Sequence, residues 1–153
     1  VRHPMASCQS LLSNDWEHFP PGGIDAYARR YLAFLDDHVD VPRLSYEAFA
    51  ADPETAVETL CAALELPYRP GTPDLIEAVR LSGDSGRRGG VIRPRPPRPV
   101  PPALAAAAAE SAQYHSLCDR LGYDPDPARS CANAASVAAA GGSKVFSKGP
   151  DTV

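Results

Sequence analysis

The chain has 153 residues, including 17 prolines and 11 glycines, and 44% of its residues are hydrophobic. This length fits one domain and excludes two full ones, while the hydrophobic share argues against a wholly disordered chain. The net charge of -4 at pH 7 argues against nucleic-acid binding by the surface as a whole. No apolar run approaches the ~20 residues that a helix needs to cross a bilayer.

The cysteines are Cys8, Cys61, Cys118 and Cys131, and no pair has the Cys-x-x-Cys spacing. No histidine lies at a zinc-finger distance from them, so the spacing argues against a structural metal site. Cys61 and Cys118 fall within apolar helical patterns, which favours buried, reduced thiols. A disulfide framework is not indicated, and the sequence therefore predicts a reducing, cytoplasmic location.

Three helices and one strand are predicted in the first half of the chain. A proline suited to a first turn opens a helix over Pro4–Leu12, and Ile24–His38 shows the clearest apolar stripe at helical spacing. Val41–Tyr46 is short and apolar, which predicts one strand. The Asp-Pro-Glu start of Asp52–Leu64 supplies an N-cap, a proline at the first helical position and an acidic first turn.

The second half contains two further predicted helices around a segment of unusual composition. Thr72–Leu81 has a threonine cap followed by proline, which predicts a helix. Ser82–Pro102 is rich in glycine and proline and holds five arginines against one acidic residue. Ala103–Leu121 is predicted as a single helix that ends at the following glycine. The Ala-, Ser- and Gly-rich residues 126–153 are predicted to form a disordered tail.

Two features of the sequence indicate an anion site. Arg2 directly precedes the first predicted helix, whose N-terminus should offer free N–H groups and a positive dipole end, and Ser10 follows on that helix. In the loop 82–90, glycines would let the backbone approach a ligand while Arg87 and Arg88 supply charge. Each feature alone is explained as readily by solvated surface residues.

Taken in order, these elements resemble the C-terminal part of a bacterial-type sulfotransferase that uses 3′-phosphoadenosine-5′-phosphosulfate (PAPS). In that family a strand ends in Arg-x-Pro, and a serine lies eight residues after the arginine on the next helix. Arg2, Pro4 and Ser10 have this spacing. The most specific stretch is Leu44–Tyr68, where a Tyr-Glu pair precedes an Asp-Pro helix start and a Leu-Pro-Tyr ending.

The resemblance implies an α/β fold of the P-loop NTPase-like sulfotransferase type. This chain would be a mostly helical C-terminal portion with one or two short parallel strands, over residues 1–125, followed by the tail. The family's Gly/Ser/Thr-rich loop for the 5′-phosphosulfate and its usual general base precede the Arg-x-Pro motif, and no such loop occurs in this sequence. We therefore expect an N-terminally truncated piece of the enzyme.

The resemblance also implies that the chain supplies the 3′-phosphate and adenine side of a PAPS site. Arg2 and Ser10 would bind the 3′-phosphate, and Tyr46 would lie near the adenine. The enzyme would transfer the sulfuryl group to a hydroxyl or amine of a small-molecule or glycan acceptor, whose identity the sequence does not indicate.

In the family, an Arg-Lys-Gly loop closes over the same phosphate. Here Arg87, Arg88 and Gly89 would take that role, with arginine in place of lysine. Sulfuryl transfer needs a general base on the acceptor. Four histidines are candidates without a neighbouring orienting motif: His3, His18, His38 and His115.

Two alternatives stay open. Arg93, Pro96 and Pro99 have the spacing of a basic polyproline ligand, which would dock on an aromatic groove of a partner protein. The missing phosphate loop is also consistent with a catalytically inert helical remnant.

Overall fold

In the computed structural model we describe residues 1–13, 22–71 and 94–129, and every regular element within them is an α-helix. The predicted helix over 72–81, the Gly/Arg loop and the tail beyond residue 129 lie outside the described residues. The helices are α1 (Pro4–Ser13), α2 (Gly23–Asp37), α3 (Tyr46–Ala51), α4 (Pro53–Ala63), α6 (Pro102–Glu110) and α7 (Ala112–Leu121).

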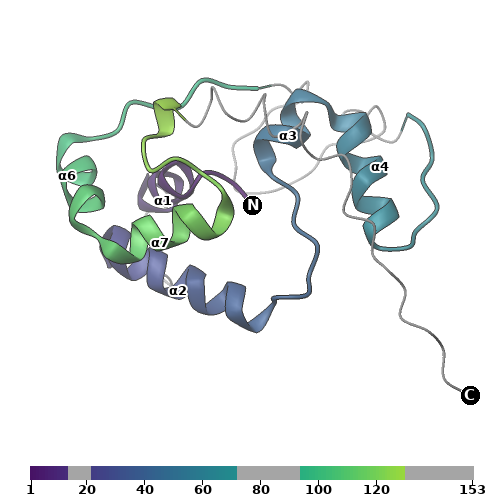
Figure 1. The fold of residues 1–153 in the computed structure, drawn as a ribbon. Coiled ribbons are helices and arrows are strands. Elements are labelled where there is room, and N and C mark those ends of the chain that lie inside the picture. The colour runs from purple at the N-terminus through teal and green to yellow at the C-terminus, as the bar shows by residue number, and fades with distance from the viewer. Residues whose placement is uncertain (14–21, 72–93, 130–153) are drawn as a thin grey trace, which may run out of the picture.

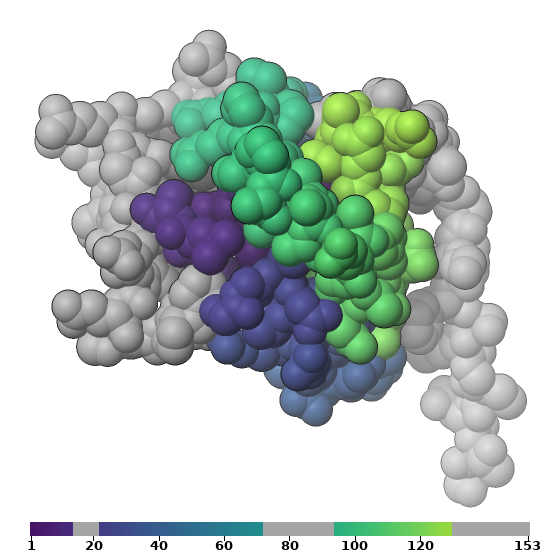
Figure 2. Space-filling view, turned by 90° about the vertical axis from the view of Figure 1, so that its left-hand side faces the viewer, coloured from purple at the N-terminus to yellow at the C-terminus, as the bar shows by residue number. Residues whose placement is uncertain are grey.

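Four of the helices enclose one hydrophobic core. Figure 1 shows α1, α2, α6 and α7 gathered on one side of the molecule, and Figure 2 shows α1, α2 and α7 packed together on one face. The predicted stripe of α2 points into this core, where Ile24, Ala28 and Leu35 are buried. The buried core residues are Met5, Cys8, Ile24, Tyr27, Ala28, Leu35, Ala108, Tyr114, Leu117 and Cys118.

The remaining two helices, α3 and α4, pack on each other to the side of this four-helix core (Figure 1). The predicted cap of α4 is confirmed, because the Asp52 carboxylate accepts the N–H of Thr55 at 3.1 Å and Pro53 stands at the first helical position. Ala50 and Ala56 are the buried side chains of these helices. The pair therefore contributes little to the core.

The α/β fold class is wrong for the described residues, which contain no β-strand. The strand predicted over Val41–Tyr46 is irregular, and its last residue already begins α3. The cause is local, since the Ser45 hydroxyl accepts the N–H of Ala48 at 3.0 Å and caps α3. A serine in this position turns the chain into a helix where the apolar pattern alone favours a strand.

The first residue of the chain pairs in parallel with the segment that leads into α3. The Val1 nitrogen donates to the Leu44 carbonyl, and the Tyr46 N–H donates to the Val1 carbonyl at 2.6 Å. This is the hydrogen-bond pattern of parallel strands. It spans one residue on each side, so it holds two segments together without making a strand.

The single helix predicted over Ala103–Leu121 is also wrong, because the chain breaks at Ser111 into α6 and α7. Ser111 has an extended backbone, and its hydroxyl accepts the N–H of Tyr114 at 3.1 Å. The same hydroxyl donates to the Asp25 carboxylate at 2.8 Å. Ser111 thus caps α7 and ties it to α2. The predicted stop at Gly122 is confirmed, with a φ of 74°.

Replacing Ser111 tests this role. We expect Ser111→Ala to lower the free energy of unfolding by about 1–2 kcal/mol, because the variant loses both the cap of α7 and the hydrogen bond to Asp25. Urea denaturation measures the loss. Ser13→Ala is the matched control, since Ser13 is exposed at the end of α1 and bonds only the Ser10 carbonyl. Equal stability of the two variants would contradict the assignment.

Two buried tyrosines of the core should respond in opposite directions to loss of the hydroxyl. The Tyr27 hydroxyl is buried without a hydrogen-bond partner in the described part of the chain, whereas the Tyr114 hydroxyl donates to the Pro125 carbonyl at 2.7 Å. We expect Tyr27→Phe to raise the free energy of unfolding by about 1 kcal/mol and Tyr114→Phe to lower it by about as much. The same urea titrations measure both. Changes of the same sign would contradict this account.

Candidate functional site

The structure brings together two of the predicted site residues, Arg2 and Tyr46. The guanidinium carbon of Arg2 lies 5.1 Å from the centroid of the Tyr46 ring. This separation is within the ~6 Å range of cation–π contacts. Both side chains are half-buried, so the surface presents a cation and an aromatic ring side by side. The two residues are 44 positions apart in the sequence.

Backbone contacts hold this pair in place. The bonds between Val1 and the segment that leads into α3 fix the residue before Arg2 against the residues before Tyr46. On the other side of Arg2, the backbone N–H of His3 donates to the Glu47 carboxylate at 3.1 Å. Arg2 therefore stands between two anchored residues, and its side chain reaches the Tyr46 ring from there.

His3 is buried, with 5% of its surface exposed, and both of its ring nitrogens have partners. Nδ1 accepts the N–H of Met5 at 3.2 Å, and Nε2 lies 3.0 Å from the Asp124 carbonyl oxygen. A carbonyl only accepts and an amide N–H only donates, so these partners assign the neutral tautomer with its hydrogen on Nε2. Burial lowers the pKa of His3, which is consistent with a neutral ring.

Glu47 and Tyr123 complete the surroundings of His3. The Tyr123 hydroxyl donates to the second oxygen of the Glu47 carboxylate at 2.6 Å, and the edge of its ring meets the His3 ring with centroids 5.1 Å apart. Burial and the bond to Glu47 raise the pKa of Tyr123. We call His3, Glu47, Tyr123 and Asp124 the His3 cluster. It joins the start of the chain, α3 and the segment after α7.

The start of α1 offers less to an anion than the sequence predicts. Pro4 has no N–H, the N–H of His3 bonds the Glu47 carboxylate, and the N–H of Met5 bonds the His3 ring. Glu47 and the His3 ring thus accept from donors that a free helix N-terminus would present. An anion at this place would depend on Arg2 more than on the helix.

The other predicted site residues are not brought together with Arg2 and Tyr46 in the described part of the chain. Ser10 is half-buried on α1, about 9 Å along the helix axis from Pro4, and no hydrogen bond joins it to Arg2 within the described residues. Arg87, Arg88 and Gly89 lie outside the described residues and stay predictions, as does His18. Of the two other candidate bases, His38 is exposed and His115 is half-buried, and each bonds a backbone carbonyl of its own neighbourhood.

Sequence reasoning missed the role of Tyr123 and gave Glu47 no function. A residue that follows a C-cap glycine commonly packs back against its helix, and this signal marks Tyr123. Its partner Glu47 lies 76 positions away, and no local pattern indicates that distance.

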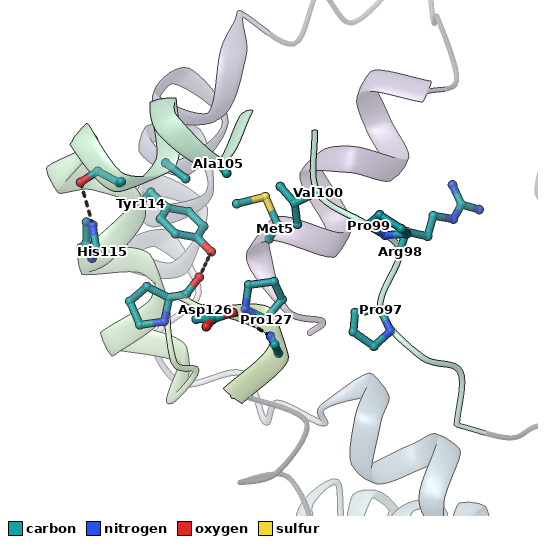
Figure 3. Close-up of a pocket in the computed structure, with 14 residues that line it drawn as sticks. Met5, Pro97, Arg98, Pro99, Val100, Ala105, Tyr114, His115, Asp126 and Pro127 are labelled. Carbon is teal, nitrogen blue, oxygen red and sulfur yellow. Dashed lines mark hydrogen bonds between the residues drawn. The ribbon is translucent and has the colours of Figure 1, made fainter. Parts of the chain in front are cut away.

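A pocket of about 540 Å³ lies elsewhere, between the segment before α6, the helices α6 and α7, and the residues after α7 (Figure 3). Its walls are mostly alanine, proline and valine. The polar groups on them are already paired within the chain, since Tyr114 bonds the Pro125 carbonyl and His115 bonds the Ala109 carbonyl. The Arg98 side chain points away from the hollow in Figure 3. No polar groups converge there on a ligand, so we place the candidate site at Arg2 and Tyr46.

Comparisons with known proteins give no match from which a function could be inferred. No protein-family model matches the chain, and neither a curated protein nor a solved structure gives a significant match. Every helix of the described ranges is too short or too polar to cross a bilayer. In those ranges no group of three or more His, Cys, Asp or Glu side chains could hold a metal ion.

Removing the Glu47 side chain tests whether the His3 cluster holds the site together. We expect Glu47→Ala to lower the free energy of unfolding by about 2 kcal/mol, because the His3 N–H and the Tyr123 hydroxyl lose their acceptor. Chemical denaturation measures this. Glu58→Ala, at an exposed position of α4, should change stability by less than about 0.5 kcal/mol. A similar small effect at Glu47 would show that the cluster does not hold the segments.

Proposed function

We propose that this chain binds the 3′-phosphate and adenine side of PAPS and belongs to a sulfotransferase acting on a hydroxyl or amine acceptor. The observation that supports the proposal is the contact of Arg2 with Tyr46. The resemblance of the sequence assigns these two residues to the phosphate and the adenine of one nucleotide. That they lie in contact, from distant positions in the chain, is what such a site requires.

The charge of Arg2 is available to a ligand. In the described part of the chain, the ion pairs are those of Arg29, Arg120 and Arg129, and none involves Arg2. A guanidinium in cation–π contact with a ring can still direct N–H groups to phosphate in a planar fork of bonds. The part of the Tyr46 ring that Arg2 leaves uncovered can pack against a base. Arg2 and Tyr46 can therefore bind the phosphate and the base of one nucleotide.

PAPS, when bound, supplies the sulfuryl group and a phosphoadenosine leaving group. Within this proposal, Arg2 neutralises the 3′-phosphate, Tyr46 orients the adenine, and Ser10 donates from the second turn of α1. Arg87, Arg88 and Gly89 close the site on the sequence evidence alone. The acceptor is a small molecule or a glycan, and no residue is assigned as its general base. The three described cysteines are free thiols, which supports the cytoplasm as the location we propose.

A second candidate function is the basic polyproline ligand. Residues 94–101 form neither helix nor strand, and 94–99 are exposed, as such a ligand requires. The segment is nevertheless held to the protein, since the Gln9 amide donates to the Pro99 carbonyl at 2.9 Å and Val100 packs against the core. We therefore rank this function second. A peptide of residues 84–102 that bound no member of a purified panel of polyproline-binding domains would remove it.

Calorimetric titration with adenosine 3′,5′-bisphosphate tests the first proposal. We expect Arg2→Ala to weaken binding by at least about tenfold, because a charge-assisted bond to phosphate is lost. Binding of adenosine 5′-monophosphate, which lacks the 3′-phosphate, should not respond to the substitution. Arg29→Ala is the control, since Arg29 is an exposed cation paired with Asp25.

The proposal fails if Arg2→Ala and Arg88→Ala, both shown to be folded by circular dichroism, bind the bisphosphate as tightly as the unaltered chain. It also fails if the unaltered chain does not distinguish the bisphosphate from the monophosphate.

A further inference from the structure

We propose that His3 is a positioning residue for Arg2, which holds Arg2 on Tyr46 while its ring is neutral and releases it when the ring is protonated. The inference rests on the proposed function, because it concerns the regulation of the same site. It makes nucleotide binding dependent on pH through a residue that does not touch the nucleotide.

The geometry admits only one protonation state of the ring. With its hydrogen on Nε2, His3 satisfies both the Asp124 carbonyl and the Met5 N–H. A second proton on Nδ1 would point a donor at the Met5 N–H, which is itself a donor. The protonated ring must therefore turn or leave, and with it goes the cap that His3 gives to α1.

Loss of the contact between the His3 ring and the Met5 N–H would affect Arg2, which is the adjacent residue. Arg2 is anchored through Val1 on one side and through His3 on the other. His3 is itself held through its ring contacts with Met5 and Asp124. If the ring leaves its place, the backbone N–H of His3 is held less firmly against Glu47, and the guanidinium gains freedom to move off the Tyr46 ring. A phosphate then meets a cation that is no longer preorganised, and binding loses affinity for that reason.

The groups around His3 and the burial of its ring act in opposite directions. The bond to the Asp124 carbonyl favours the protonated ring, as do the carboxylates of Glu47 on α3 and of Asp124 and Asp126 after α7. Both Glu47 oxygens already accept bonds, from the His3 N–H and from the Tyr123 hydroxyl. Burial outweighs the carboxylates and lowers the pKa of His3 below its ordinary 6.5.

The direction of the pH effect follows from this balance. A base whose pKa is lower in the folded chain binds fewer protons there than in the unfolded chain. The contribution of His3 is therefore complete above pH 6.5 and is lost as the pH falls below that value toward the pKa of the folded form. The placement of Arg2 in the folded chain should change at the lower end of this window, because there the ring of the folded protein takes up its proton.

His3→Asn separates positioning from mere stability. Asparagine is a favourable N-cap that can accept the Met5 N–H but does not titrate. We expect the affinity of the unaltered chain for adenosine 3′,5′-bisphosphate, relative to that of His3→Asn, to stay constant above pH 6.5. It should fall by up to about tenfold per pH unit once the pH is below the pKa of His3 in the folded chain, since one proton is linked. The ratio of the two proteins cancels the titration of the nucleotide itself. His38→Asn, which removes an exposed histidine, should keep the pH response of the unaltered chain.

A second readout needs no nucleotide. The ring resonances of Tyr46, which report the Arg2 contact, should shift with the protonation of His3 in the unaltered chain and stay constant in His3→Asn. Parallel pH profiles of the two proteins in both measurements would overturn the inference and leave the nucleotide site intact. Absence of nucleotide binding at pH 7.5 would instead overturn the proposed function, and the Tyr46 resonances would then decide alone whether His3 positions Arg2.

Discussion

The carboxylate of Glu47 is the group on which the arrangement of the molecule depends. One oxygen accepts from the backbone beside Arg2, and the other accepts from Tyr123 after α7. These bonds join α3 to two segments that already pack against the hydrophobic core, the start of α1 and the residues after α7. The buried core contains no side chain of α3 or α4. The candidate site lies at this junction. Its geometry is therefore set by polar contacts of partly buried groups, whose strength depends on each keeping its partner.

Much of the helical structure could be predicted because its signals are local. The stripe of α2 and the Asp52 cap of α4 act within a few residues, and both were predicted correctly. The errors have a common physical origin in two serines. Ser45 starts a helix inside an apolar run, and Ser111 divides a run of strong helix formers. The spacing of apolar residues does not register a hydroxyl that caps the backbone. It therefore predicts a strand around Ser45 and an unbroken helix across Ser111.

The contact between Arg2 and Tyr46 joins two residues that the sequence singles out, but the contacts that hold them were not predicted. The resemblance named Arg2 and Tyr46, and the structure brings them into contact. It could not indicate that His3 caps α1, because that arrangement depends on a carbonyl 121 positions away. A helix start that looks open in the sequence is consequently occupied in the fold. His3 both accepts the N–H of Met5 and anchors the backbone beside Arg2, and the sequence indicates neither contact.

The separation of α3 and α4 from the four-helix core has a consequence for the order in which the protein opens. Units that share few buried contacts exchange their amide hydrogens through separate local openings. The α3–α4 unit should open before the core, and the seam between them runs between Arg2 and Tyr46. A nucleotide held by both residues would span that seam, and its binding free energy would be added to the cost of parting the two units. A bound nucleotide would thus slow the opening of the α3–α4 unit as well as occupy the site.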